Sequence, residues 1–195
     1  MYRLRIELNG IEPMIWRRIE VPSSYTFYDL HVAIQDAMGW LDYHQHEFEL
    51  QRRGRGVRIG IPGEFVRETV RASWEVPLAD YLSARKKLTY LYDFGDDWDH
   101  TIHVEAVTTD DSNRSLPRCV AGENATPPED CGGPSGYSGL KAVLAGPKNA
   151  EYRSVREWLK NGHAKCYWVF DPFAFDIAKV VFRDPREQLK AVSGD

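Results

Sequence analysis

The stretch LTYLYDFGDDWDHTIHV, residues 88–104, decides how the rest of the sequence is interpreted. Two apolar, β-prone runs flank a polar turn that contains Gly95. Strand, glycine-containing turn and strand form the pattern of a β-hairpin with a three-to-five-residue loop. Four carboxylates, a Trp and a His crowd this turn, which needs at most one or two of them for its own geometry. We therefore expect the hairpin to lie at the functional edge of the molecule.

Length and composition favour a single domain over residues 1–195. A hydrophobic content of 43% and an aromatic content of 12% are sufficient for a packed core. No apolar run approaches the ~18–20 residues of a membrane span, so no membrane association is expected. The three cysteines make a disulfide framework improbable and indicate a reducing, cytoplasmic location.

Negative charge is concentrated in the middle of the chain. The net charge is −4, but residues 93–130 hold ten acidic and two basic residues. Like charge repels a phosphate backbone, so nucleic-acid binding is disfavoured there. An acidic centre suits a cation, a basic partner or ordinary solvated loops.

Hydrophobic periodicity predicts an α+β fold. Alternation over 2–8 indicates a half-buried strand, and Thr26 with Asp29 resembles a capping box that begins a helix ending near Gly39. Trp16, on the return strand, is expected to be buried against that helix. The expected elements are strands over 2–8, 15–21 and 46–51, a first helix over 26–38, the 88–107 hairpin, and helices over 138–145 and 150–160. This order predicts a mainly antiparallel sheet packed with helices, a β-grasp-like roll with a strand-strand-helix-strand-strand core plus C-terminal helices that close the core.

The segment 119–137 is too rich in Pro and Gly for regular structure. It has little apolar surface of its own, so it becomes ordered only by packing on something else. We expect it to pack against the 92–100 hairpin, with the amides of Gly132 and Gly133 meeting Asp93 or Asp96. A ligand groove is predicted between the two segments.

Several short motifs resemble a known family. They are PMIWRR at 13–18, LH at 30–31 with GW at 39–40, HQHEF at 44–48, YDFGD at 92–96 with Trp98 and His100, GE at 122–123, and PPEDCGG at 127–133. Together they resemble the Ri-plasmid (pRiA) open-reading-frame-three-like family, some members of which carry insertion-element passenger or TnpR-like resolvase labels. The resemblance implies an α+β fold and an association with mobile elements. Nothing here provides a Ser nucleophile setting or a helix-turn-helix for a resolvase. Where the family often has a Cys before the PPED run, this chain has Thr126, which weakens a shared thiolate-metal site.

The favoured function is a non-enzymatic binding or adaptor module for an unknown protein or small ligand. The groove residues are predicted to be Asp93, Asp96, Trp98, His100, Glu129 and Asp130. The alternative is a metal-dependent hydrolase or nuclease that uses the same carboxylates and His100, because hard cations favour clustered carboxylates. A divalent metal is the one cofactor that these residues suggest. The structural explanation also stays open, since turn aspartates commonly bond their own amides.

Two other sites are less favoured. Zinc would need Cys119 and Cys131 with His100 or His103, but the cysteines form no CxxC pair. Nucleic acid would need the basic run that contains Arg52, Arg53, Arg55 and Arg58. A solvated hairpin turn is the favoured explanation of that run, because short basic patches are frequent on ordinary surfaces.

Overall fold

The computed structural model describes residues 1–52, 55–63, 70–108, 115–163, 165, 167 and 170–193. The strands are β1 (Tyr2–Leu8), β2 (Ile15–Val21), β3 (His46–Arg52), β4 (Arg55–Gly60), β5 (Arg71–Ala72), β6 (Lys87–Tyr92), β7 (Trp98–Val107) and β8 (Arg118–Glu123). The α-helices are α1 (Phe27–Met38), α2 (Gly133–Ala145), α3 (Ala150–Asn161) and α4 (Pro185–Ser193). Short 3-10 turns are η1 (Ser73–Glu75), η2 (Leu78–Asp80) and η3 (Ile177–Lys179).

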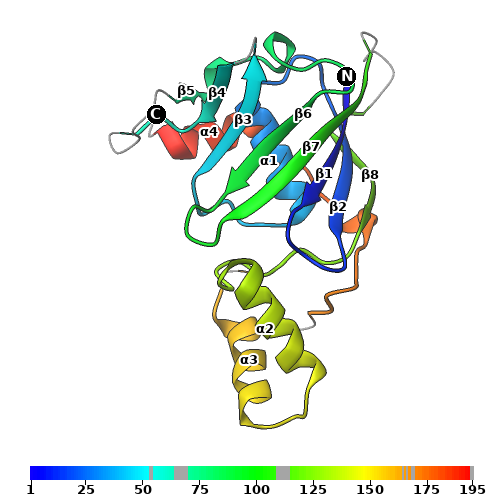
Figure 1. The fold of residues 1–195 in the computed structure, drawn as a ribbon, viewed down its shortest axis with the longest axis vertical. Coiled ribbons are helices and arrows are strands. Elements are labelled where there is room, and N and C mark those ends of the chain that lie inside the picture. The colour runs from blue at the N-terminus through cyan, green and yellow to red at the C-terminus, as the bar shows by residue number, and fades with distance from the viewer. Residues whose placement is uncertain are drawn as a thin grey trace.

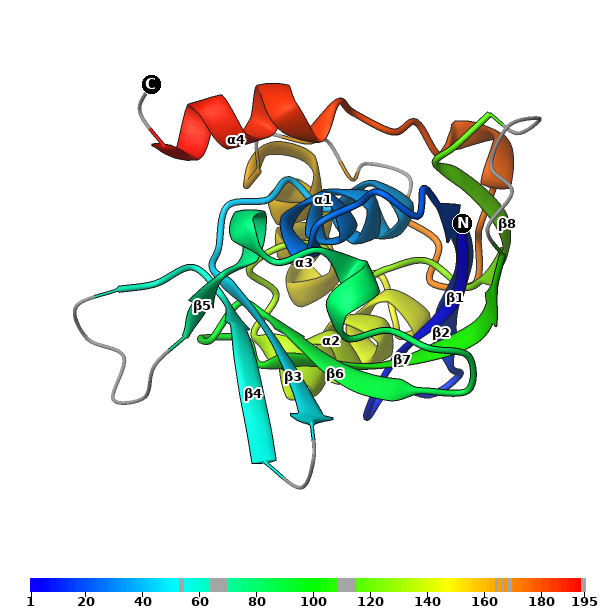
Figure 2. The same cartoon turned by 90° about the horizontal axis from the view of Figure 1, so that it is seen from above.

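The strands form one sheet in the order β5-β4-β3-β6-β7-β1-β2-β8. Every neighbouring pair is antiparallel except β4 and β5. Helices α1 and α4 lie on one face of the sheet, as Figures 1 and 2 show from two directions. The predicted α+β class with a mainly antiparallel sheet is confirmed, and the chain starts with the predicted strand-strand-helix-strand-strand order.

The central hairpin forms where the sequence places it. Strands β6 and β7 pair from Lys87 with His103 to Tyr92 with Trp98, leaving residues 93–97 as the turn. Alternate side chains of both strands enter the core, as period-two patterning requires. Asp93 and Asp97 adopt positive φ angles of 57° and 58°, a conformation that Asp tolerates better than most residues.

Helix α1 has the predicted ends. The side chain of Thr26 accepts from the amide of Asp29, and the side chain of Asp29 accepts from the amide of Thr26. Gly39 ends the helix with φ of 80°, where a side chain would be strained. The helix packs on the sheet through the main hydrophobic core.

The prediction for Trp16 is wrong. Ile15, Ile19 and Val21 are buried against the helix layer, so the residue of β2 that shares their face is Arg17. Trp16 is half-buried on the outer face, with the guanidinium of Arg5 3.9 Å from its ring. Truncating Trp16 therefore removes a surface contact rather than core volume.

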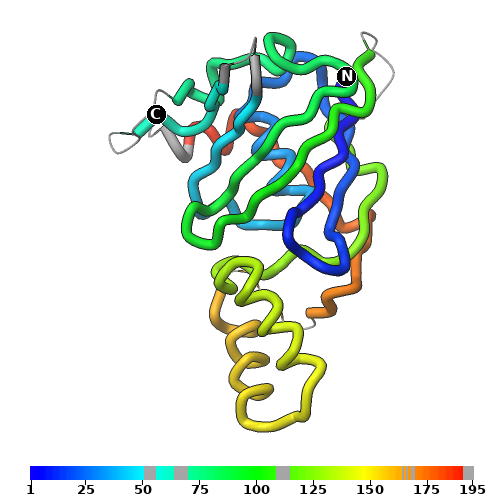
Figure 3. The backbone as a smooth tube through the Cα atoms, viewed as in Figure 1, coloured from blue at the N-terminus to red at the C-terminus, as the bar shows by residue number. Residues whose placement is uncertain are grey.

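The segment predicted to be irregular contains regular structure at both ends. Residues 118–123 form β8, which pairs with β2, and α2 begins at Gly133, so the loop proper is 124–132. Helices α2 and α3 pack together and project below the sheet rather than closing its core (Figure 1). Figure 3 shows the segment from 170 onward running back along the β8 side towards α4.

The basic run is a hairpin tip between β3 and β4, as its sequence indicates. Arg53 and the side chains of Arg52 and Arg55 lie outside the described residues. Arg58 donates to Glu47 at 2.8 Å. Among the described helices, none is both long and apolar enough to span a bilayer.

Candidate functional site

Three loops that are far apart in the sequence meet at the lower end of the sheet in Figure 1. The α1–β3 loop carries His44, the β6–β7 turn carries Asp93, and the loop before α2 carries Asp130. The Nε2 atom of His44 lies 3.0 Å from Oδ1 of Asp130 and 3.5 Å from Oδ2 of Asp93. Asp93 is buried, His44 is half-buried and Asp130 is exposed. We call these three residues the His–Asp cluster.

The donor set of the His–Asp cluster fits a divalent ion. Its three ligand atoms all lie within 4.8 Å of one another. Two ligands at about 2.1 Å from a shared ion are roughly 3.0–3.4 Å apart in octahedral or tetrahedral geometry. The observed separations of 3.0 and 3.5 Å are close to these values. Without an ion, the same atoms form a histidine–carboxylate hydrogen bond.

Asp93 has a structural and an outward-facing oxygen. Its Oδ1 accepts from the amides of Gly95 at 2.9 Å and Asp96 at 3.2 Å, which closes the turn. Its Oδ2 is the atom that faces His44. The turn interpretation therefore holds for Oδ1, while Oδ2 is the oxygen that contributes to the His–Asp cluster.

Buried Glu129 holds the three loops together. Its Oε1 accepts from the amide of Leu41 at 2.7 Å and from the hydroxyl of Tyr92 at 3.2 Å. The same hydroxyl accepts from the amide of Tyr43, next to the His–Asp cluster. Burial raises the pKa of Glu129, whereas these donors lower it. Because Glu129 is fully buried, we assign it to bracing the cluster rather than to ligand contact.

The turn and the α2 loop touch directly. The amide of Gly132 donates to Oδ2 of Asp96 at 3.1 Å, as the sequence predicts for this pair of segments. A Cβ on Gly133 would lie 2.3 Å from the carbonyl oxygen of Asp96, so only glycine allows this approach. The indole of Trp40 adds a bond to the carbonyl of Pro127 at 3.0 Å. The β6–β7 turn and the loop before α2 are thus in direct contact, and we call this contact the joint. The groove predicted between these two segments is closed where they touch.

Two exposed aromatic residues adjoin the cluster in the sequence. Tyr43 precedes His44 and is 52% exposed, and Phe94 follows Asp93 and is 51% exposed. Large apolar side chains that stay exposed beside polar groups are typical of binding surfaces. The surface at this end therefore combines carboxylates, an imidazole and aromatic rings.

The structure separates the predicted site residues into three groups. Asp93 and Asp130 belong to the His–Asp cluster, and Asp96 and Glu129 support it from behind. Trp98 and His100 are fully buried in the core and are not available to a ligand. His44 was not predicted, although the HQHEF motif contains it; a polar, aromatic loop between helix and strand was the available signal.

The alternative zinc site does not form from the described residues. Burial raises the pKa of both Cys119 and Cys131, the latter to about 12. Both thiols are unpaired, and the potential metal-binding group found in the described parts of the chain contains neither. His103 lies on the outer face, where it bonds Glu7 at 3.1 Å.

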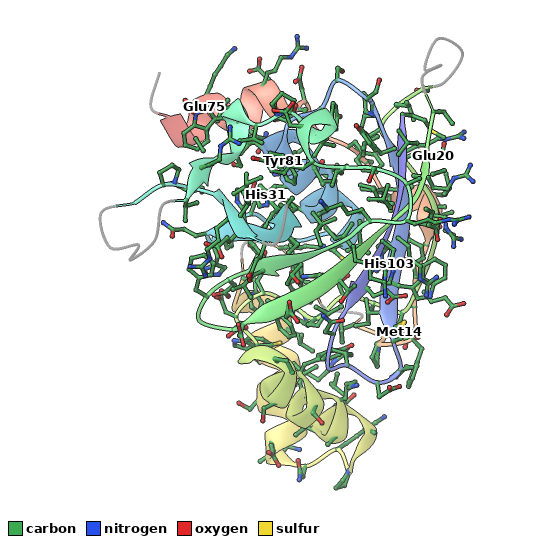
Figure 4. All side chains as sticks on the ribbon, turned by 45° about the horizontal axis from the view of Figure 1, so that its top comes forward. Met14, Glu20, His31, Glu75, Tyr81 and His103 are labelled. Carbon is green, nitrogen blue, oxygen red and sulfur yellow. The ribbon has the colours of Figure 1, made fainter. Side chains whose placement is uncertain are left out.

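A buried polar layer lies directly behind the site. The rings of His31 and His46 stack 3.6 Å apart between α1 and the sheet, where Figure 4 labels His31. His31 bonds Tyr90 through Nδ1 at 2.8 Å and Asp42 through Nε2 at 2.7 Å. Asp42 and His46 flank His44 in the α1–β3 loop, so this layer fixes both sides of the loop that presents the cluster histidine.

Buried histidines are expected to make the protein acid-sensitive. Burial lowers the pKa of His100 to about 4 and that of His46 well below its ordinary value. An unfolded histidine titrates near 6.5, so below that pH the unfolded chain binds protons that the folded chain does not. Stability should be complete above about pH 6.5 and fall towards pH 4, by on the order of 3 kcal/mol for His100. Urea midpoints between pH 8 and 4 measure this loss.

The control compares two histidine variants. His100→Gln should reduce the pH dependence of the urea midpoint, and His103→Gln should leave it unchanged. The same pH dependence in both variants would contradict the assignment of the acid sensitivity to His100.

The structure is an α+β fold with a mainly antiparallel sheet, and three loops meet at one end of it to form the candidate site. The chain belongs to the family described as Plasmid pRiA4b ORF-3-like protein, whose model matches residues 1–179. It is 34% identical over 160 residues to uncharacterized protein y4hQ of Sinorhizobium fredii, covering 80% of this chain and 79% of that protein. The crystal structure of a protein of unknown function, MM3350 from Methanosarcina mazei Go1, superposes with a TM-score of 0.81 at 38% identity, covering 93% of this chain and 97% of that one. The predicted family is confirmed, and no enzymatic function is indicated by these relatives.

Proposed function

We propose that this chain is a non-enzymatic binding module that holds a positively charged ligand at the His–Asp cluster. The observation that carries the proposal is the convergence of His44, Asp93 and Asp130 from three separate loops. Asp93 and Asp130 supply two carboxylate oxygens within 3.5 Å of one imidazole nitrogen. Such a set attracts a cation and repels phosphate.

The neighbouring aromatic rings indicate what kind of cation fits. Tyr43 and Phe94 are both exposed; the ring of Tyr43 lies 6.5 Å from that of His44, and Phe94 follows Asp93 in the sequence. A lysine or arginine side chain presents an aliphatic stem and a cationic head, and aromatic faces attract such cations. A basic segment of a partner protein satisfies both features. The braces at Glu129 and Asp96 limit the reorganisation that binding would require.

The second candidate is a metal-dependent hydrolase or nuclease at the same cluster, with His44 in the place predicted for His100. The spacing of the three ligand atoms favours it, since three protein ligands leave positions open for water and substrate. His44, Asp93 and Asp130 would hold the ion, and the ion would activate a bound water.

Metal analysis and peptide titration distinguish the two candidates. The proposed module should contain no stoichiometric metal after purification and should bind an arginine- and lysine-containing octapeptide but not its glutamate counterpart. Asp93→Asn and Asp130→Asn should each weaken peptide binding by about tenfold or more, since each removes a charge-assisted contact. Asparagine at 93 keeps an Oδ1 acceptor for the turn amides, so folding is preserved.

Asp97→Asn is the matched control, because Asp97 lies in the same turn but outside the cluster. It should bind the peptide as the wild type does. One equivalent of a divalent ion that is lost in both cluster variants, with no peptide binding, would overturn the module and support the hydrolase. If Asp97→Asn weakened peptide binding as much as the cluster variants do, binding would depend on the general negative charge of this region and not on the His–Asp cluster.

The plasmid origin in the family's name supports an association with mobile genetic elements. A cytoplasmic location stays a prediction from the cysteine count.

A further inference from the structure

The α2–α3 pair carries a second surface, whose hollows contain none of the residues of the His–Asp cluster. The two helices pack on each other and project from the sheet (Figures 1 and 3). Tyr137 and Leu140 of α2 and Leu159 of α3 are the large apolar residues of the pair that are fully or nearly fully buried. Much of the remaining side-chain surface of the pair therefore faces outward.

A groove of about 530 Å³ lies between these helices and the returning segment 170–173. Its walls are mostly apolar, and they include Leu144 of α2, Tyr152 of α3 and Phe173 of the returning segment. Phe173 is 67% exposed, which is unusual for a phenylalanine unless something covers it. The groove is therefore apolar and open.

The groove continues into a basic depression. A second hollow of about 440 Å³ shares Tyr152 and Arg156 with the first and adds Lys148 and Arg153. Residues 133–163 hold five Lys and Arg against two Glu, a net charge of +3, whereas the whole chain carries −4. The helical pair is thus a basic unit on an acidic protein.

The acidic residues of this lining are engaged locally. Asp171 accepts from the amide of Phe173 at 3.0 Å, and Glu157 accepts from the side chain of Asn161 at 2.5 Å. They reduce the positive charge of the lining but do not reverse it, since four basic residues line the two hollows.

We propose that this groove docks an acidic amphipathic segment of a partner protein. Apolar side chains of the segment would cover Phe173 and Tyr152, and its carboxylates would face Arg153 and Arg156. The apolar walls favour a peptide over nucleic acid, because a phosphate backbone has no apolar side chains to cover them. Helix-in-groove recognition uses this combination of apolar anchors and complementary charge.

Fluorescence anisotropy with a synthetic probe tests the proposal. The probe is a labelled 14-residue peptide with Leu at i, i+3, i+4 and i+7 spacing and Glu at most other positions. A second peptide replaces every Glu by Gln, and a labelled single-stranded 14-nucleotide DNA serves as the polyanion. We expect the Glu peptide to bind at least tenfold more tightly than the Gln peptide and the DNA, with affinity falling as salt rises.

Variants locate the binding on the groove. Arg153→Gln with Arg156→Gln should weaken the Glu peptide at least tenfold, and Phe173→Ser should do the same with little change in thermal stability, because Phe173 is exposed. Lys190→Gln, an exposed cation on α4, is the control and should leave affinity unchanged. Tighter binding of the DNA, equal binding of the Gln peptide, or no binding at millimolar peptide would overturn the proposal. Concentration-dependent self-association in sedimentation, abolished by Phe173→Ser, would replace it with a second copy of this chain as the occupant.

Discussion

Replacing Arg17 by alanine is expected to lower the free energy of unfolding by about 3–5 kcal/mol. The side chain is 1% exposed, and each of its nitrogens donates a hydrogen bond. The acceptors are the carbonyls of Ala37, Trp16, Glu123 and Asn124 and the hydroxyl of Thr126. One side chain thus joins β2, the end of α1 and the start of the 124–132 loop.

The guanidinium is held without a carboxylate partner among the described residues. Burial lowers the pKa of Arg17 to about 10, which still leaves it charged at neutral pH. The ring of Phe175, from the C-terminal segment, lies 3.8 Å from the guanidinium carbon and covers it. Alanine would leave several buried acceptors unpaired and a cavity of arginine size, and this combination accounts for the large expected cost.

Arg18→Ala is the matched control for this experiment. Arg18 is the next residue of the same strand but lies on the outer face, paired with Glu105 at 2.7 Å. A partly exposed pair of this kind contributes under about 1 kcal/mol. Urea denaturation of both variants measures the difference. Similar losses for Arg17→Ala and Arg18→Ala would contradict the role assigned to the buried side chain.

Gly133→Ala is expected to destabilise the protein by about 2–5 kcal/mol and to detach the α2 loop from the β6–β7 turn. Gly133 has φ of 66°, which strains any residue with a Cβ. The added Cβ would also lie 2.3 Å from the backbone carbonyl oxygen of Asp96, a neighbour that has little room to move. The bond from Gly132 to Asp96 lies next to this contact and should be lost with it.

Hydrogen exchange measures how Gly133→Ala changes the order of the loop before α2. In the wild type, the amides of Gly132 and Gly136 have hydrogen-bond partners and should be protected. In Gly133→Ala the amide of Gly132 should exchange much faster, and ligand binding at the His–Asp cluster should weaken with it. Gly139→Ala lies in the same helix with nothing within 4 Å of the new Cβ, so it should be neutral or stabilise by up to about 1 kcal/mol. Unchanged protection at Gly132 in Gly133→Ala would show that the joint is not needed for order.

Local patterns were sufficient for several of the elements. The capping pair at Thr26 and Asp29, the glycine after α1 and the alternation in β1 each depend on neighbouring residues, and each was predictable. The buried face of β2 was predictable as well. Ile15, Ile19 and Val21 are an even number of residues apart and therefore point to the same face of the strand, whereas Trp16 points to the other. The expectation that this strand covers the helix was correct, but it was applied to the face that carries Trp16 instead of the face that carries Arg17, and this produced the error.

The packing of the 119–137 segment was predictable in part. Its shortage of apolar side chains correctly required a neighbour, and glycine correctly indicated a close backbone approach to the hairpin. Its composition did not indicate that residues 118–123 would pair with β2, because whether a segment forms an edge strand depends on which strand lies beside it in the fold.

The sequence by itself determined the α+β class, the central hairpin, the family and two of the three cluster residues, Asp93 and Asp130. Only the tertiary structure decided that His44 joins them, while His100, which is much nearer Asp93 in the sequence, lies in the core. The reason is geometric. In a strand, direction alternates at every residue, so His100 points inward with Trp98, whereas His44 lies in a loop whose course is fixed by Glu129 and Asp42. Contacts between loops separated by about 40 residues depend on the whole fold, and no local pattern encodes them.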